Sequence, residues 1–396
     1  MLSPSISRLI LICCVLLTPA GFAFANAPVV VVSIEALSAE VETLETQLDD
    51  PQTLNRLIAI DDGLTVDQRP GIPAIRGRIL NLLGGTGEES ALEYVRRVFE
   101  NQSEFRDEAA MALSLHSYRK PTNLQDWRFL IRSLTVTRGE QTVSVMKALL
   151  RYRQRATNSH WIKRVLLQTE QLNEQQRPVA IELLGHWTGL NESDPETAMK
   201  ADLAFYQNWY AQKWPEEQPA TWPEEPETQR WKYAPLLKTL DQTIYSADLL
   251  EQGKAVYEKA SCAKCHVKGD IGQNFGPDLS GIGALRQRSE LLEGILYPSL
   301  EIHEDYPTVT VLSKDGKTIS GLLSAGEPGS VKIVDPKGKA TLIAQSEIEE
   351  IQTSSVSNMP AGGLEQLTEQ EIIALFAFLQ HQENSKKPFH GESQDQ

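Results

Sequence analysis

The feature that most constrains this chain is a C-x-x-C-H motif formed by Cys262, Cys265 and His266. This pattern is typical of covalent attachment of a c-type haem. The spacing suits the chemistry, because each thiol adds to one vinyl group of the porphyrin and the two must lie a short turn apart. The imidazole that follows is held against the ring, where its neutral nitrogen is a good iron ligand. The sequence therefore predicts one haem c, with its iron, per chain.

Two other interpretations of the motif are a zinc half-site and a disulfide. A structural zinc site normally needs a second pair of ligands at similar spacing, and the sequence offers none. A disulfide between Cys262 and Cys265 would leave His266 without a role. Haem attachment explains all three residues and is the preferred interpretation.

Residues 1–27 have the pattern of a secretory signal peptide. Arg8 precedes a short apolar run, and an A-x-A cleavage pattern follows at Ala23–Ala25. The apolar run is too short to span a bilayer. A lipoprotein signal is the alternative, but Cys13 follows Ile12, where a small residue would be expected. We expect a periplasmic or extracellular protein with no transmembrane segment after cleavage.

The region from 28 to 214 is expected to be helical, because its apolar residues recur at helical spacing. Four similar segments start at Ile79, Met111, Lys147 and Ile181, which are 32, 36 and 34 residues apart. Such a period predicts paired helices stacked as an α-solenoid with HEAT-like repeats. An irregular helical domain is the alternative.

The remaining chain divides into three expected parts. Residues 215–235 are rich in Pro, Glu and Trp and read as a linker, whose tryptophans we expect to pack onto a domain. A cytochrome c-like domain is expected over 236–383, bracketed by two helices, the second of which begins with a capping box at Thr368–Glu371. The tail, 384–396, is polar and expected to be disordered.

Within that domain, residues 306–353 have a different pattern. Short runs of alternating apolar and polar residues are separated by the turn signals Asp315-Gly316, Pro328-Gly329 and Lys337-Gly338. This pattern predicts four or five antiparallel strands, inserted in the cytochrome fold as a small β-barrel. The fold class is therefore mainly α, with one β insertion.

Met359 is the candidate for the second axial ligand of the iron. It is the only methionine after Met199, and it lies in a loop of Pro and Gly residues without apolar neighbours at regular spacing. A lone methionine usually fills a core, but a thioether on such a loop is available to iron. His/Met ligation is a cytochrome c pattern and raises the reduction potential. An open site, or His303 or His381 as ligand, is the alternative.

Several of these motifs together resemble the planctomycete-type haem-binding domain family. The resemblance covers about 245–382 and rests on Cys262–Gly283, Leu291–Ser299, the Asp315-Gly316 hairpin, the segment Ser357–Pro360 and the last helix. It implies a class I-like cytochrome c with a β insertion between the proximal histidine and the distal methionine. It also implies that the carbonyl of Pro277 accepts the ring N–H of His266 and orients the ring.

Relatives in that family often carry a sugar-dehydrogenase-like β-propeller ahead of the haem domain, whereas the upstream part of this chain reads as helical. We therefore expect an electron carrier, or the redox subunit of a dehydrogenase system, rather than an enzyme. A peroxidase-like haem enzyme or sensor with a displaceable Met359 is one alternative. A repeat scaffold with an accessory haem is the other.

The partners are expected to be redox proteins, for example a separate dehydrogenase. The net charge of −15 favours a partner with a positive face, and no basic patch suggests nucleic acid. The helical region and the β insertion supply no cysteine, so we expect both to serve partner choice rather than haem chemistry.

Overall fold

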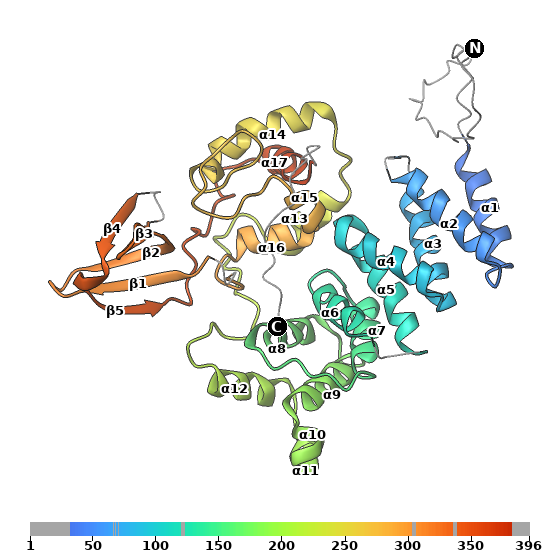
Figure 1. Ribbon diagram of the computed structural model, residues 1–396, viewed down its shortest axis with the longest axis horizontal. Helices are drawn as coiled ribbons and strands as arrows, with labels where there is room; N and C mark the ends of the chain where they lie inside the picture. Colours follow the sequence, from blue (N-terminus) through green and yellow to red (C-terminus); the bar gives the residue numbers. More distant parts are fainter. Residues whose placement is uncertain are drawn as a thin grey trace.

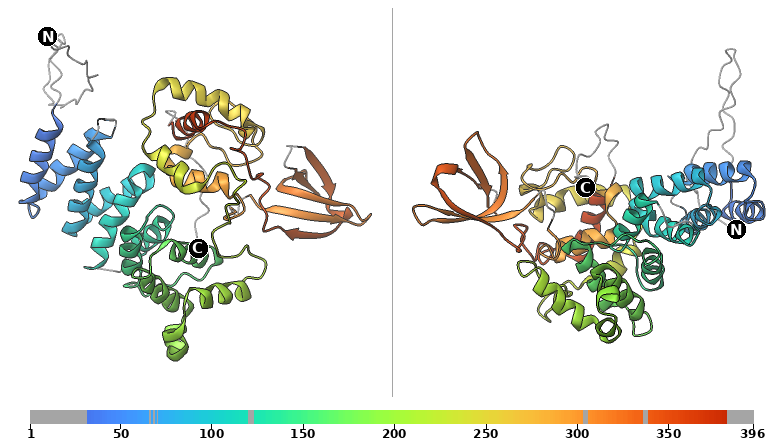
Figure 2. Two further views of the ribbon diagram at one scale, coloured as in Figure 1. Left: turned by 180° about the vertical axis from the view of Figure 1, so that it is seen from behind. Right: turned by 60° about the horizontal axis from the view of Figure 1, so that its bottom comes forward.

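The computed structural model describes residues 32–65, 67, 69, 71–119, 123–302, 306–335 and 339–381. The expected signal peptide and the expected polar tail lie outside these residues. The described chain is mainly helical, with one small antiparallel sheet. The first helices and the sheet lie at opposite ends of the molecule, and the helices that follow the motif lie between them (Figures 1 and 2).

The N-terminal helical region comprises helices α1 to α12. Four have a proline at the first or second position, which suits the first turn because a backbone N–H there needs no partner within the helix. The helices are α1 Ile34–Glu45, α2 Pro51–Leu64, α3 Ile72–Thr86, α4 Glu89–Asn101, α5 Arg106–Ser117, α6 Leu124–Ser133, α7 Glu140–Leu149, α8 Ser159–Gln171, α9 Arg177–Thr188, α10 Leu190–Ser193, α11 Pro195–Lys200 and α12 Leu203–Lys213, with a 3₁₀ turn at Ser103–Phe105.

Alternate helices of this region pack side by side in the order α3, α5, α7, α9. The four similar sequence segments lie in these helices, the third running on into the turn after α7. Side chains near the helix ends also make equivalent contacts between neighbouring helices of this series. Arg119 Nη1 donates to the Thr86 carbonyl at 2.7 Å, and Nε2 of His186 lies 3.1 Å from the Tyr152 carbonyl, across 33 and 34 residues. The assignment to HEAT-like repeats stays a prediction.

The motif region comprises the helices from α13 onward. Two of them, α14 and α17, pack against each other where Gly253 leaves room: an added Cβ would lie 2.6 Å from Cβ of Phe378. The predicted capping box of α17 is confirmed, with Thr368 and Glu371 bonded reciprocally. The bounds are α13 Tyr233–Asp241, α14 Ala247–Lys259, a 3₁₀ turn Cys262–Lys264, α15 Ile282–Leu285, α16 Arg288–Leu296 and α17 Glu369–Gln380.

The predicted β insertion forms five antiparallel strands in the order β4-β3-β2-β1-β5. Its apolar core contains Val309, Val311, Ile333 and Ile343. The strands are β1 Thr308–Ser313, β2 Thr318–Ala325, β3 Ser330–Val334, β4 Ala340–Ala344 and β5 Ile348–Thr353.

The structure shows a small antiparallel sheet that is not paired between β4 and β5 in the described residues, and the small β-barrel stays a prediction. The sheet is curled, because its two edge strands are joined by only three residues, Gln345–Glu347. The strands diverge from that corner (Figure 1), and β4 and β5 each pair with a single neighbour. A closed barrel needs a ladder between its first and last strands, and here the curl brings them together only at one end.

The segment between α12 and α13 contains no helix or strand and packs onto the N-terminal helical region. Trp222 Nε1 donates to the Leu167 carbonyl at 2.9 Å, and its backbone N–H donates to Glu170 at 2.7 Å. The Trp222 ring also lies against Tyr233 and Tyr297 of the motif region. The expectation that the tryptophans of this segment pack onto a domain is confirmed for Trp222.

Buried charges join the N-terminal helical region to α16. Arg164 has 2% of its side chain exposed and contacts Glu293 at 2.8 Å and Glu301 at 2.6 Å. Arg106, equally buried, donates to the Leu285 carbonyl at 2.6 Å and lies 3.3 Å from Glu290. Each part has its own apolar core. The interface between them thus combines polar groups that are shielded from water with an apolar cluster formed by Leu167, Tyr297 and Leu300.

Candidate haem-binding site

The motif lies on a tight turn directly after α14. Ser261 adopts a left-handed conformation with φ of 65°, which ends the helix and starts the 3₁₀ turn. The backbone N–H of His266 then donates to the carbonyl of Cys262 at 2.9 Å. Cys262 and Cys265 thus lie at the two ends of one turn, and both are free thiols, each half-buried. This is the local arrangement that the motif chemistry needs.

The ring of His266 is oriented by a contact between its Nδ1 atom and a backbone carbonyl. Its Nδ1 lies 2.8 Å from the carbonyl oxygen of Pro277, which is the contact that the family resemblance implies. A carbonyl can only accept, so Nδ1 carries the proton and Nε2 keeps its lone pair. The Tyr257 hydroxyl donates to the backbone carbonyl of His266 at 2.8 Å. The contact with Pro277 leaves Nε2 as the nitrogen that can bind a metal.

Gly276 packs directly against the imidazole. A Cβ at this position would lie 2.7 Å from Cε1 and 2.9 Å from Nδ1 of His266. The backbone N–H groups of Phe275 and Gly276 both donate to the Cys265 carbonyl, at 2.9 and 2.7 Å, and hold the loop in place. The ring therefore lies between the motif turn and a loop that has no side chain at the point of contact.

We expect Gly276→Ala to disturb the orientation of His266. The added methyl overlaps the ring, which lies between backbone segments, so the ring must tilt or the loop must move. The expected result is a changed absorption spectrum of the haem-loaded protein and a midpoint of thermal unfolding several degrees lower. Gly281→Ala is the control, because a Cβ there meets no atom within 4 Å. A spectrum and a midpoint equal to those of the control would contradict this packing.

Burial keeps the site neutral. It raises the pKa of the Cys262 thiol to about 11 and also raises the pKa of Cys265. Burial lowers the pKa of His266, and the contact with Pro277 opposes this shift without cancelling it. At neutral pH the site therefore presents two protonated thiols and a neutral imidazole. The neutral imidazole is the form that binds iron.

The donor set fits a haem better than a structural zinc ion. In the part of the chain that the structure describes, no group of three or more His, Cys, Asp or Glu side chains is arranged to hold a metal. A structural zinc site would need four such ligands. Two thiols beside one oriented imidazole match covalent haem attachment, because the porphyrin would supply iron ligands of its own.

The structure brings Cys262, Cys265, His266 and Pro277 together but places Met359 on a different loop, between β5 and α17. Met359 is half-buried, and its backbone N–H donates to Ser357 Oγ at 3.2 Å. The loop adjoins the sheet through Asn358. Its ligand role stays a prediction.

The rival ligands fall elsewhere. His381 is exposed at the C-terminal end of α17, and His303 lies outside the described residues. Sequence reasoning missed Gly276 and Tyr257. The only signal for Gly276 was its place directly before Pro277.

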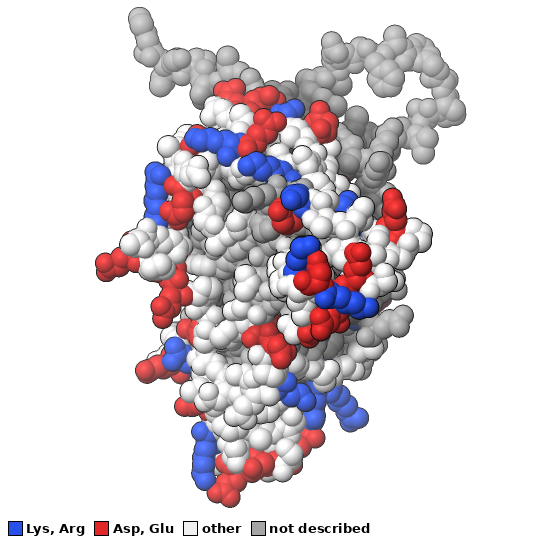
Figure 3. Space-filling model, turned by 90° about the vertical axis from the view of Figure 1, so that its left-hand side faces the viewer, with Lys and Arg blue, Asp and Glu red and all other residues white. Residues whose placement is uncertain are grey.

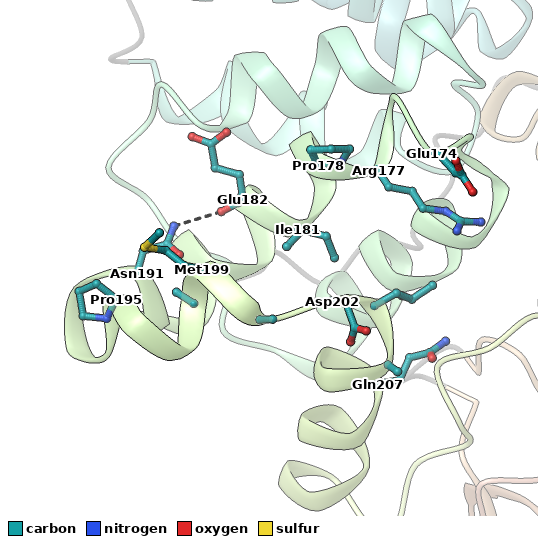
Figure 4. A pocket seen from close by; sticks show the side chains of 14 residues that line it. Glu174, Arg177, Pro178, Ile181, Glu182, Asn191, Pro195, Met199, Asp202 and Gln207 are labelled. Carbon is teal, nitrogen blue, oxygen red and sulfur yellow. Dashed lines mark hydrogen bonds between the residues drawn. The ribbon is translucent and has the colours of Figure 1, made fainter.

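A cavity of about 820 Å³ lies in the N-terminal helical region, between α9, α11 and α12 (Figure 4). Its lining mixes charged side chains such as Glu174 and Arg177 with apolar ones such as Ile181 and Met199. It includes no residue of the motif region, so it is separate from the candidate haem site.

Residues 250–302 match the family model described as cytochrome c. The match contains the motif and Pro277 and ends before the sheet and Met359. It supports a cytochrome c-like haem-binding domain in this part of the chain and implies a covalently bound haem c with its iron. A comparison with curated proteins found no significant match. Among the described residues, none of the helices combines the length and the apolar character needed to span a bilayer.

Proposed function

We propose that this chain is an exported c-type cytochrome that transfers single electrons between redox proteins. It carries one haem, attached through Cys262 and Cys265, with His266 and Met359 as axial ligands. The observation that carries the proposal is the geometry of His266, whose Nδ1 faces Pro277 while two free thiols lie on the preceding turn. The cytochrome c match over the same residues supports it.

In this proposal each residue has a distinct task. The two thiols form thioethers by adding S–H across vinyl groups, which fixes the haem to the turn. His266 offers Nε2, and Pro277 holds the ring in one tautomer and one orientation. The bound haem supplies one-electron redox chemistry. Met359 would be the second protein ligand of the iron, which would leave no open position for a substrate.

Export and partner choice belong to the same proposal. Cytochrome c domains are typically exported, which agrees with the signal-like pattern of residues 1–27. At the sheet end of the molecule, positive and negative side chains are interspersed (Figure 3). This face offers no single-sign patch, so we propose that redox partners dock on other surfaces, including the N-terminal helical region.

We expect the haem of the purified protein to be bound covalently. Haem staining after denaturing electrophoresis should label the full-length chain, and the Cys262→Ala/Cys265→Ala double variant should give no stain. Redox titration should show one reversible one-electron step. Haem that dissociates on denaturation would exclude covalent attachment. A five-coordinate spectrum that binds peroxide or gases readily would instead favour the haem enzyme or sensor.

A further inference from the structure

One strand of the sheet contacts both loops of the candidate haem site. On β3, Lys332 Nζ lies 5.8 Å from the centre of the Phe275 ring, on the loop that carries Gly276 and Pro277. Two residues further along β3, the carbonyl of Val334 accepts a bond from Nδ2 of Asn358 at 3.2 Å. Because a strand rises about 3.3 Å per residue, the backbone positions of Lys332 and Val334 are roughly 7 Å apart.

Asn358 is the residue through which the sheet holds the Met359 loop. It has 7% of its surface exposed and directly precedes Met359. Its backbone N–H donates to Oγ1 of Thr308, on β1, at 2.8 Å, in addition to the side-chain bond to Val334. The neighbouring Ser357 N–H donates to Oγ of Ser299 at 3.0 Å. The loop is thus tied to two strands and to the segment after α16.

We infer that Asn358 is a positioning residue for the distal ligand, and that β1 and β3 are the frame on which it is fixed. This inference rests on the proposed ligation of iron by Met359. It also revises the expectation that the β insertion serves partner choice alone. The insertion lies between the two axial ligands in the sequence, and its strands hold the second ligand in place.

The effect follows from a two-state equilibrium. In the closed state Met359 occupies the axial position and both bonds of Asn358 are made. In the open state the loop has moved and an external ligand can bind. Loss of one bond destabilises only the closed state, so the open population increases, and the apparent affinity for an external ligand rises in proportion. An ordinary hydrogen bond corresponds to roughly a threefold to tenfold change.

The test compares Thr308→Val and Asn358→Ala in the full-length, haem-loaded protein. Each should raise the cyanide affinity of the ferric protein roughly threefold to tenfold and lower the reduction potential, without loss of haem. Thr308→Ser keeps the acceptor hydroxyl and should restore both values. Thr310→Val is the matched control, since it lies on the same strand and its hydroxyl bonds Ser320. In a Met359→Ala background, Asn358→Ala should change cyanide affinity no further.

The possible outcomes separate the inference from the proposed function. If Met359→Ala alters the spectrum while Thr308→Val and Asn358→Ala bind cyanide like the parent, the ligand is correct and the positioning role is wrong. If Met359→Ala itself changes nothing, the proposed ligation fails. If Thr310→Val has the same effect as Thr308→Val, the effect comes from the sheet in general, and the role of Asn358 is overturned. If Asn358→Ala fails to fold, the comparison of Thr308→Val with Thr308→Ser tests the positioning role instead.

Discussion

Met359→Ala is expected to leave the haem attached and to open the iron to small ligands. The proposed attachment uses Cys262 and Cys265, which lie on another loop, so haem staining should match that of the parent protein. The thioether raises the reduction potential, so its loss should lower the potential. Cyanide affinity of the ferric protein should increase by far more than the threefold to tenfold expected from one hydrogen bond, because the internal competitor is gone.

Met199→Ala is the matched control for this experiment. It removes the same side chain from α11, in the N-terminal helical region, where Met199 has 88% of its surface exposed. Spectrum, potential and cyanide affinity should all equal those of the parent. If Met359→Ala behaves like Met199→Ala, the sixth ligand is another group or the position is open.

Arg164→Ala is expected to cost about 3–5 kcal/mol of stability, because it breaks a buried ion pair by removing one partner. Arg164 bonds both Glu293, which has 7% of its side chain exposed, and Glu301. Burial tends to raise the pKa of Glu301, but Arg164 and His160 outweigh this and hold it well below the usual value. Without the guanidinium, the buried carboxylate of Glu293 would lose its contact with Arg164 beneath the interface.

Denaturant unfolding of the haem-loaded protein measures this effect, followed by haem absorbance and by far-ultraviolet circular dichroism. The control is Arg56→Ala. Arg56 pairs with Glu40 at 2.6 Å, but its side chain is 55% exposed, so the change should be at most about 1 kcal/mol. We expect Arg164→Ala to shift the haem-detected transition as well, because α16 belongs to the motif region. A haem transition unchanged from the parent would show that the interface does not stabilise that region.

The local sequence was sufficient to predict those structural elements that depend only on residues close together in the chain. The C-x-x-C-H turn needs only the five residues from 262 to 266. The capping box of α17 likewise lies within four residues, Thr368 to Glu371. The strands of the insertion follow from alternation over a few residues, and the four similar helical segments follow from period and composition. Each of these signals is short-range, so the chemistry of the residues was sufficient to predict it.

Only the tertiary structure decided which distant groups meet. Arg164 and Glu293 are 129 residues apart, and neither lies in a sequence motif that indicates its partner. Asn358 reaches Thr308 across 50 residues, and this contact ties the loop that carries Met359 to β1. Whether the sheet closes depends on its curl, and the curl depends on how all five strands pack. Such contacts depend on three-dimensional packing around each side chain, which residue types and spacing do not specify.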